Sequence, residues 1–288
     1  MLINRASKRI EQMLDDAVAG RFRESDYDET ELSRIETKWK RFLGTSALSR
    51  ENLLKEKENI KSLVSDISHQ TKTPVANIRL YTELLNEKLC SNDKDAQREQ
   101  EIEMLREISR QTDKLEFLIQ SLTKMSRLES NILEVQPAQQ GIRELLESTV
   151  ADILPTAEKK QIKIINNYVD NETAFYDMKW TKEALYNVLD NAVKYSPVHS
   201  VVTVSVRQFG LYSAVSVKDQ GIGIREEDTS RIFGRFYRAE DVQQEDGVGI
   251  GLYLTREILK KEGGYVKVNT SCEEGTEFLL YLRKEKYY

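Results

Sequence analysis

The sequence predicts a multidomain fold with α and α/β parts: a dimeric antiparallel four-helix bundle with long N-terminal helices, followed by an α/β sandwich. Hydrophobic residues make up 39% of the 288 residues and charged residues 32%, whereas globular proteins average roughly 45 to 50% and 25%. This balance favours elongated helices whose core a second copy of the chain completes. Apolar side chains recur at steps of three and four before residue 130, and short β-type runs alternate with helices beyond residue 136, which indicates two architectures.

The first 50 residues are expected to form an N-terminal helical domain. Residues 4–18 have the apolar spacing of a short amphipathic helix that ends at Gly20, and residues 21–28 form a polar connector. A second helix is predicted over residues 30–43, and it is expected to stop at Gly44.

Residues 51–135 are expected to form a helical hairpin. A long helix is predicted from about residue 46 to 89, the turn-forming residues 90–95 break it, and a partner helix follows over about 97–129. The apolar stripe of each helix is too narrow to enclose a core within one chain. Because two such hairpins make a four-helix bundle, a homodimer is expected.

The first helix of this hairpin carries a histidine outside its apolar seam. The seam residues are Ile60, Leu63, Ile67, Thr71, Pro74, Ile78, Tyr81 and Leu85. His69 lies about 200° around the helix from Ile67, and Asp66 and Thr73 share its face. Pro74 cannot donate a hydrogen bond to the carbonyl of Gln70, so it bends the helix beside the histidine. The stretch alone leaves open a functional histidine or an inert surface histidine on a coiled coil.

Residues 136–288 are expected to form the α/β sandwich, with the domain boundary between residues 131 and 141. Helices are predicted at 142–153, 179–195 and 250–262, and strands at 162–169, 201–209, 211–219, 265–270 and 276–283. Helices packed on one face of a mixed sheet make a domain of ordinary size at about 150 residues.

Two segments of this domain contain residue types that bind nucleotides. Asn187 and Asn191 lie one turn apart on one helix face, and amide oxygens can bind Mg²⁺ when phosphates supply the negative charge. Asp219 ends a predicted strand and is followed by Gly221 and Gly223. Its carboxylate can accept a hydrogen bond from an adenine amine, and glycines let the backbone approach a ligand. Each segment alone is equally compatible with a solvated helix face or an ordinary turn.

A third segment, Gly247-Val-Gly249-Ile-Gly251, opens the last predicted helix. Exposed amides and the positive end of the helix dipole suit a triphosphate there, although the G-x-G-x-G spacing is not that of a Rossmann site. Residues 225–246 are long and charged enough for a lid. They contain Ile232-Phe-Gly-Arg-Phe-Tyr-Arg238, whose arginines could contact phosphates.

In this order, the segments resemble the asparagine box, glycine boxes and phenylalanine box of the ATP-binding domain shared by histidine kinases, gyrase, Hsp90 and MutL. The stretch Ser68-His-Gln-Thr-Lys-Thr-Pro74 resembles the phosphoacceptor box of sensor histidine kinases of two-component systems. The resemblance covers residues 60–288. It makes a signal-relay linker one interpretation of residues 1–50, and a charged coiled-coil leader without a signalling role remains the other.

The resemblance implies a role for each matching residue. His69 would be phosphorylated, and the amides of Asn187 and Asn191 would bind Mg²⁺ together with ATP. The remaining implied contacts are Lys194 to the phosphates, Tyr195 to the adenine face, Asp219 to the adenine amine and Arg235 to the γ-phosphate. The implied backbone cradle consists of Gly221, Gly223, Gly247, Gly249 and Gly251.

Three residues near His69 bear on its chemistry. Gln70 stands where many similar kinases have a glutamate thought to take the histidine proton, and an amide cannot do so. Asp66 is a candidate substitute base. Thr73 is placed, as in similar kinases, to position water for removing phosphate from a response regulator. His199 matches no box and is expected to be a loop histidine.

The expected function is an ATP- and Mg²⁺-dependent protein-histidine kinase that phosphorylates His69, passes the phosphoryl group to an aspartate of a cognate response regulator, and also dephosphorylates that regulator. The alternative is a catalytically silent, ATP-sensing dimeric scaffold, against which His69 and the complete nucleotide boxes argue. An ATPase that moves DNA or folds clients is disfavoured, because the histidine helix would then have no purpose.

Charge, cysteines and hydropathy limit the partners and the location. The net charge is -5 without a dominant basic cluster, so no nucleic-acid partner is expected. Cys90 and Cys272 are isolated, which fits a reducing compartment. No apolar run approaches the roughly 18 residues of a membrane helix. The chain is therefore expected in the cytoplasm. Sensor kinases of the kind it resembles are often membrane receptors, so the resemblance implies the cytoplasmic part of a membrane-anchored bacterial sensor whose anchor lies outside this sequence.

Overall fold

The computed structural model of the chain describes residues 31–89, 97–129, 135–167, 172–239, 242, 247–271 and 275–285. The chain divides at His69 into two compact units, residues 1–69 and 70–288. The helix predicted at 4–18, the connector at 21–28 and the break at 90–95 lie outside the described residues. Within the described ranges, no helix is long and apolar enough to cross a membrane.

The histidine lies on helix α2, which spans Glu31–Leu89 without interruption. The predicted stop at Gly44 was wrong. A glycine inside a helix costs only about 1 kcal/mol relative to alanine, and good helix formers such as Leu43 and Ala47 lie within one turn on each side. The hydroxyl of Thr45 also donates to the carbonyl of Arg41 at 3.0 Å, so its hydrogen bond is made within the helix. Pro74 lies inside α2, as predicted, and is buried.

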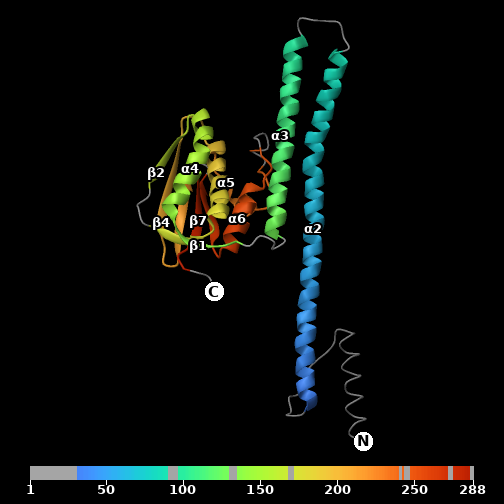
Figure 1. Cartoon of the computed structure of the whole chain (residues 1–288), viewed down its shortest axis with the longest axis vertical. Helices are drawn as coiled ribbons and strands as arrows, with labels where there is room; N and C mark the ends of the chain where they lie inside the picture. The colour runs from blue at the N-terminus through green and yellow to red at the C-terminus, as the bar shows by residue number, and fades with distance from the viewer. Residues whose placement is uncertain are drawn as a thin grey trace. The chain divides into compact units, whose positions relative to one another are not determined.

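Helix α3 spans Gln97–Glu129, the range predicted from the sequence, and runs antiparallel beside the C-terminal part of α2 (Figure 1). Two columns of residues with a spacing of seven run along this helix. One column, Gln111, Leu118 and Met125, is buried. The other contains Leu105 and Ile119, which are 53% and 56% exposed within a single chain. The hairpin therefore leaves an apolar stripe uncovered.

The α/β domain contains one mixed sheet. Its strands are β1 (Ala138–Gly141), β2 (Lys163–Asn167), β3 (Thr173–Tyr176), β4 (Val201–Gln208), β5 (Tyr212–Lys218), β6 (Tyr265–Ser271) and β7 (Gly275–Arg283). The order is β1-β3-β7-β5-β4-β2, with β6 also paired to β7. Strands β2 and β4 are parallel, and the other pairs are antiparallel. The five predicted strands are confirmed, and β1 and β3 are additional.

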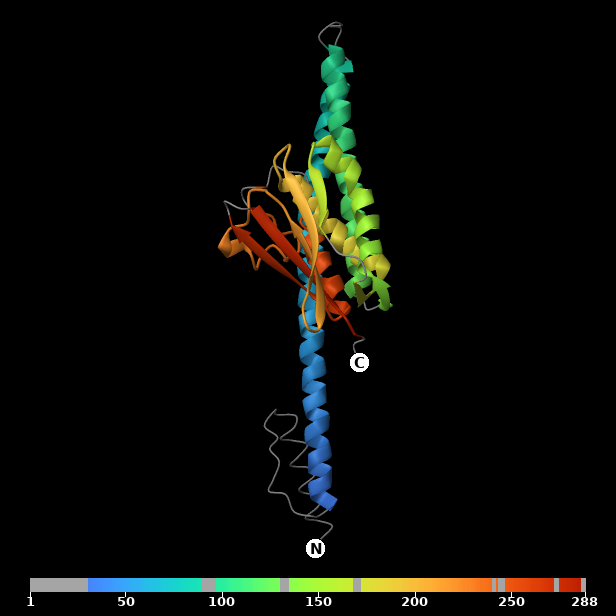
Figure 2. The same ribbon diagram turned by 90° about the vertical axis from the view of Figure 1, so that its left-hand side faces the viewer.

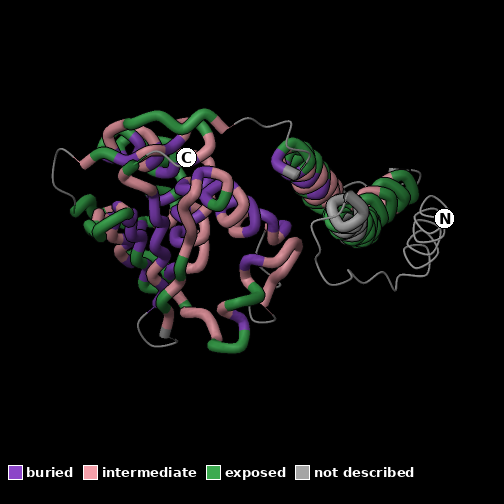
Figure 3. Tube along the Cα trace, turned by 90° about the horizontal axis from the view of Figure 1, so that it is seen from below, coloured by how far each residue is buried: buried purple, intermediate pink, exposed green. Residues whose placement is uncertain are grey.

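Three helices cover one face of this sheet (Figures 1 and 2): α4 (Ile142–Lys159), α5 (Met178–Tyr195) and α6 (Gly251–Lys261). Helix α4 continues beyond its predicted end at residue 153, through Pro155. The core lies between the helices and the sheet, where buried segments are concentrated (Figure 3). It includes Leu146, Leu189, Val204 and Leu280, each no more than 1% exposed. The predicted α/β sandwich is confirmed.

Helix α5 is held at both ends, which fixes the residues it presents. At its start, the Asp177 carboxylate accepts hydrogen bonds from the backbone N–H groups of Lys179 and Trp180 at 3.0 and 3.3 Å, an N-cap. At its end, the Lys160 ammonium donates to the carbonyls of Val193 and Lys194, where a cation is favourable. The last turn of α5, which contains Asn191, Lys194 and Tyr195, is therefore held in a fixed position.

Candidate nucleotide-binding site

A cavity of about 430 Å³ opens beside the last two turns of α5. Nine predicted nucleotide residues line it: Asn187, Asn191, Lys194, Tyr195, Asp219, Gly223, Gly247, Gly249 and Gly251. They come from α5, the turn after β5 and the glycine-rich segment before α6, so segments far apart in sequence meet at one place. A volume of this size lies within the usual range for small-molecule sites.

Asp219 lies at the inner wall of this cavity and is 4% exposed. Its Oδ1 accepts hydrogen bonds from the backbone N–H groups of Gly221 at 2.8 Å and Thr276 at 3.1 Å. Burial raises the pKa of the Asp219 carboxyl, and these two hydrogen bonds oppose the rise. No hydrogen bond from the described part of the chain reaches Oδ2. That oxygen can therefore accept a hydrogen bond from a ligand amine.

Two glycines of the predicted cradle, Gly221 and Gly249, are packed against backbone carbonyls without room for a side chain. A Cβ atom on Gly221 would lie 2.7 Å from the carbonyl oxygen of Tyr195, and one on Gly249 would lie 2.7 Å from that of Tyr237. Gly249 also has a φ of +76°, which favours glycine. Gly221 does not line the cavity, unlike the other four glycines of the predicted cradle. Gly249 lets the glycine-rich segment pack against residues 236–237.

The polar groups at the end of α5 fit a metal-bound polyphosphate. Asn187 Nδ2 is buried without a hydrogen-bond partner. The amide of Asn187 lies against Gly251, because a Cβ atom on that glycine would be 3.2 Å from Asn187 Oδ1. Lys194 Nζ donates to the Tyr195 hydroxyl at 3.2 Å and supplies positive charge. No cluster of three His, Cys, Asp or Glu side chains suited to a metal occurs in the described ranges. Mg²⁺ at this site would depend on amide oxygens, water and the phosphates themselves.

An acidic neighbour was not anticipated from the sequence. Asp190 lines the cavity one position before Asn191. Burial raises the pKa of the Asp190 carboxyl, and the positive charge of Lys194 acts in the opposite direction. The position of Asp190 beside Lys194 could have been anticipated from the sequence, because the two residues are one helical turn apart.

The arginines differ from the expectation. Arg235 does not line the cavity in this structure, and its guanidinium lies 5.1 Å from the ring centroid of Tyr253. Arg225 and Arg238 line it instead. Arg238 belongs to the Ile232–Arg238 stretch whose arginines were expected to contact phosphates, whereas Arg225, two residues after Gly223, was not singled out.

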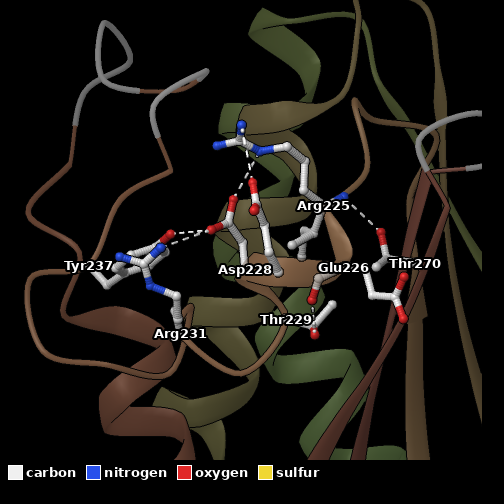
Figure 4. Close-up of polar contacts among 9 residues, drawn as sticks. Arg225, Glu226, Asp228, Thr229, Arg231, Tyr237 and Thr270 are labelled. Atoms are coloured by element: carbon white, nitrogen blue, oxygen red, sulfur yellow. Dashed lines mark hydrogen bonds and ion pairs between the residues drawn. The ribbon is translucent and has the colours of Figure 1, made fainter.

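Residues 225–239 are organised by one buried carboxylate, which the sequence did not single out. Asp228 is 1% exposed and interacts with Arg225, Arg231 and Tyr237 (Figure 4). The hydrogen bond from the Tyr237 hydroxyl is the main cause that lowers the pKa of the Asp228 carboxyl, and the two arginines act in the same direction. The carboxylate therefore carries its negative charge at neutral pH.

His69 is exposed on α2, together with Thr73 one turn later. Gln70 and Asp66 are partly buried, and Asp66 Oδ2 lies 3.5 Å from the Ser62 hydroxyl, which donates to it. The helical spacing keeps Asp66, His69 and Thr73 on one face.

Two family models match the chain. One is described as the His Kinase A (phospho-acceptor) domain and matches residues 60–131. The other, described as histidine kinase-, DNA gyrase B- and HSP90-like ATPase, matches residues 176–286. Their order follows the histidine helix and the nucleotide cavity described above. The chain belongs to the two-component sensor histidine kinases.

Known histidine kinases support this assignment. The sensor protein SrrB of Staphylococcus aureus is 24% identical over 226 residues, which are 78% of this chain and 38% of SrrB. The structure of the Acinetobacter baumannii histidine kinase AdeS matches with a TM-score of 0.60 and 16% identity, over 76% of this chain and 98% of AdeS. Histidine kinase ThkA, solved in complex with response regulator protein TrrA, also has a TM-score of 0.60, with 19% identity, over 90% of this chain and 68% of ThkA. These two structures share the fold of this sensor histidine kinase.

Proposed function

We propose that the chain is an ATP-dependent protein-histidine kinase that phosphorylates His69 and passes the phosphoryl group to an aspartate of a response regulator. The observation that carries the proposal is a cavity lined by nine of the expected nucleotide residues, in a chain whose other matched domain displays an exposed histidine. The proposed domains are residues 1–50 as an N-terminal helical linker, 51–135 as the dimerisation and phosphotransfer hairpin, and 136–288 as the ATP-binding domain.

In the proposed ATP complex, the adenine amine donates to Asp219 Oδ2 while Tyr195 contacts the ring. The phosphates lie against Lys194 and the glycine-rich segment, and Arg225 and Arg238 line the same cavity. Asn187 and Asn191 would hold Mg²⁺, which would neutralise phosphate charge when bound. The protein supplies position and positive charge, which provide most of the acceleration in phosphoryl transfer.

The proposed chemical step forms one bond and breaks one bond. An imidazole nitrogen of His69 attacks the γ-phosphorus of ATP, and the bond to the bridging oxygen breaks, so that ADP leaves. The attacking nitrogen uses its lone pair, so the proton that must depart is the one on the other ring nitrogen, and Gln70 cannot accept it. Asp66, on the same helix face, is the candidate acceptor. The phosphoryl group then passes to a regulator carboxylate, and Thr73 is assigned to regulator dephosphorylation.

A homodimer is part of the proposal. The exposed column of α3, with Leu105 and Ile119 more than half accessible, is an apolar surface of the kind that a second hairpin covers in a four-helix bundle. The regulator is expected to bind the exposed helix face around His69. The solved complex of histidine kinase ThkA with response regulator protein TrrA is a precedent for such an assembly.

Labelling with γ-labelled ATP tests the phosphoacceptor directly. The wild-type chain should acquire acid-labile, alkali-stable label, and His69→Gln should abolish it while ATP affinity stays nearly unchanged. The chain has two histidines, so His199→Asn is a matched control. His199 lies in an exposed turn with φ +65°, a conformation that asparagine tolerates. Label that persists in His69→Gln contradicts the assignment, and an unlabelled wild type that binds ATP supports the scaffold alternative.

A further inference from the structure

We propose that Asp228 is a positioning residue for the nucleotide triphosphate: by holding Arg225 and Tyr237, it fixes both ends of the connecting segment, residues 225–239, against the nucleotide cavity. This inference rests on the proposed function, since it assigns the cavity to ATP. It adds a residue that does not itself match any of the nucleotide boxes.

The connecting segment has little regular structure, yet it contains one fully paired carboxylate. Asp228 sits in a short 3-10 turn whose neighbours Glu226 and Glu227 are exposed. Its Oδ2 accepts from Arg225 Nε at 3.1 Å, and its Oδ1 accepts from the Tyr237 hydroxyl and lies 3.7 Å from Arg231 Nη1. A buried carboxylate is costly unless it is paired in this way. The burial of Asp228 therefore indicates that the fold requires a carboxylate at this position.

The same residue also organises the backbone of the segment. Its N–H group donates to the carbonyl of Arg225 at 2.9 Å, and its own carbonyl accepts from the N–H groups of Arg231 and Ile232 at 2.8 and 2.9 Å. The start of the segment is tied to the sheet, because Ile224 N donates to the Thr270 hydroxyl on β6 at 2.8 Å (Figure 4). Asp228 thus links an anchored start to the far end of the segment.

The far end, at Tyr237, contacts the glycine-rich segment. The Tyr237 hydroxyl is held by Asp228, and its ring faces the Arg231 guanidinium at 4.7 Å. Phe236 has a φ of +57°, a conformation that surrounding contacts must maintain in a bulky residue. A Cβ atom on Gly249 would lie only 2.7 Å from the carbonyl oxygen of Tyr237, so the two backbone segments are in close contact. The position of Tyr237 is therefore coupled to that of the phosphate-facing backbone.

Arg225, Tyr237 and Arg238 all line the cavity, so loosening the Asp228 contacts should disturb its cationic side. The adenine side is held independently. Asp219 is fixed by the N–H groups of Gly221 and Thr276, and neither residue belongs to the connecting segment. Loss of Asp228 should therefore affect recognition of the triphosphate more than recognition of adenine.

The test compares ATP with AMP in the presence of Mg²⁺, using competition against a fluorescent ATP analogue. The full chain carries His69→Gln throughout, so that binding is measured without turnover. Asp228→Asn and Tyr237→Phe should each weaken ATP binding about tenfold, as expected for the loss of a hydrogen bond to a charged group. AMP affinity should change less than about twofold. The two losses should not multiply in the double variant, because both changes weaken the same contact between Asp228 and Tyr237.

Glu227→Gln is the matched control. Glu227 lies next to Asp228 and pairs with Arg225 at 3.5 Å, but its side chain is 70% exposed, so both affinities should remain unchanged. The proposal is overturned if Asp228→Asn binds ATP as tightly as the parent chain, or if AMP affinity falls by the same factor as ATP affinity. Failure of the wild-type chain to label from ATP would refute the kinase assignment and leave this binding comparison intact.

Discussion

Glu262 should make the stability of the ATP-binding domain fall as pH rises. The residue is 5% exposed and accepts hydrogen bonds from the Asp177 N–H group at 3.1 Å and from the Thr181 hydroxyl at 2.9 and 2.8 Å. Burial raises the pKa of the Glu262 carboxyl from 4.5 to about 8, although these hydrogen bonds favour the charged form. The carboxyl therefore keeps its proton at neutral pH in the folded chain.

The sign and size of the effect follow from this difference in pKa. Between pH 4.5 and 8 the unfolded chain has released a proton that the folded chain retains. Each pH unit in this window therefore lowers the free energy of unfolding by about 1.4 kcal/mol. At pH 7 the accumulated loss is about 3 kcal/mol relative to acidic pH. Glu262→Gln removes the ionisation while an amide can still accept from Asp177 and donate to Thr181.

We expect Glu262→Gln to match the wild type near pH 4.5 and to exceed it by about 3 kcal/mol at pH 7. Urea unfolding of the full chain between pH 4.5 and 8 measures this difference. A Trp39→Phe background leaves Trp180, beside Thr181 in α5, as the fluorescent reporter. Glu158→Gln, on the exposed side of α4, is the control. Parallel stability curves for wild type and Glu262→Gln would refute the reasoning.

Three further predictions concern the hairpin. Ile119→Lys should convert the dimer to a monomer in sedimentation experiments, whereas Asp113→Lys, about 120° away around α3, should not. Equal masses for the two variants would contradict the proposed interface. Gln70→Glu should raise the rate of autophosphorylation tenfold or less, because it supplies a base. Single-turnover labelling from pH 6 to 9 with an unchanged rate and profile would show that proton removal is not limiting. Thr73→Ala should lower regulator dephosphorylation by about 10² or less while affecting autophosphorylation much less, and equal dephosphorylation rates would make Thr73 only a helix residue.

Long periodic elements were predictable from the sequence, and short ones were not. Helix α3 spans the predicted residues because its apolar periodicity continues over many turns and polar turn formers precede it. Strand β1, with the sequence Ala-Gln-Gln-Gly, has no apolar alternation, and it exists because it pairs with β3 at the edge of the sheet. Gly44 shows the opposite error, since a local helix breaker was outweighed by helix formers on both sides.

The candidate site shows the same limit at the level of side chains. Asn187, Asn191 and Lys194 could be placed together from the sequence, because helical spacing fixes which residues share a face. The arginines could not, because Arg235 and Arg238 belong to a segment without a repeating backbone. There, direction depends on tertiary contacts, such as the stacking of Arg235 on Tyr253 and the hydrogen bond from Tyr237 to Asp228. A motif therefore identifies the cations available to a phosphate, whereas the buried partners of the segment decide which cation reaches the cavity.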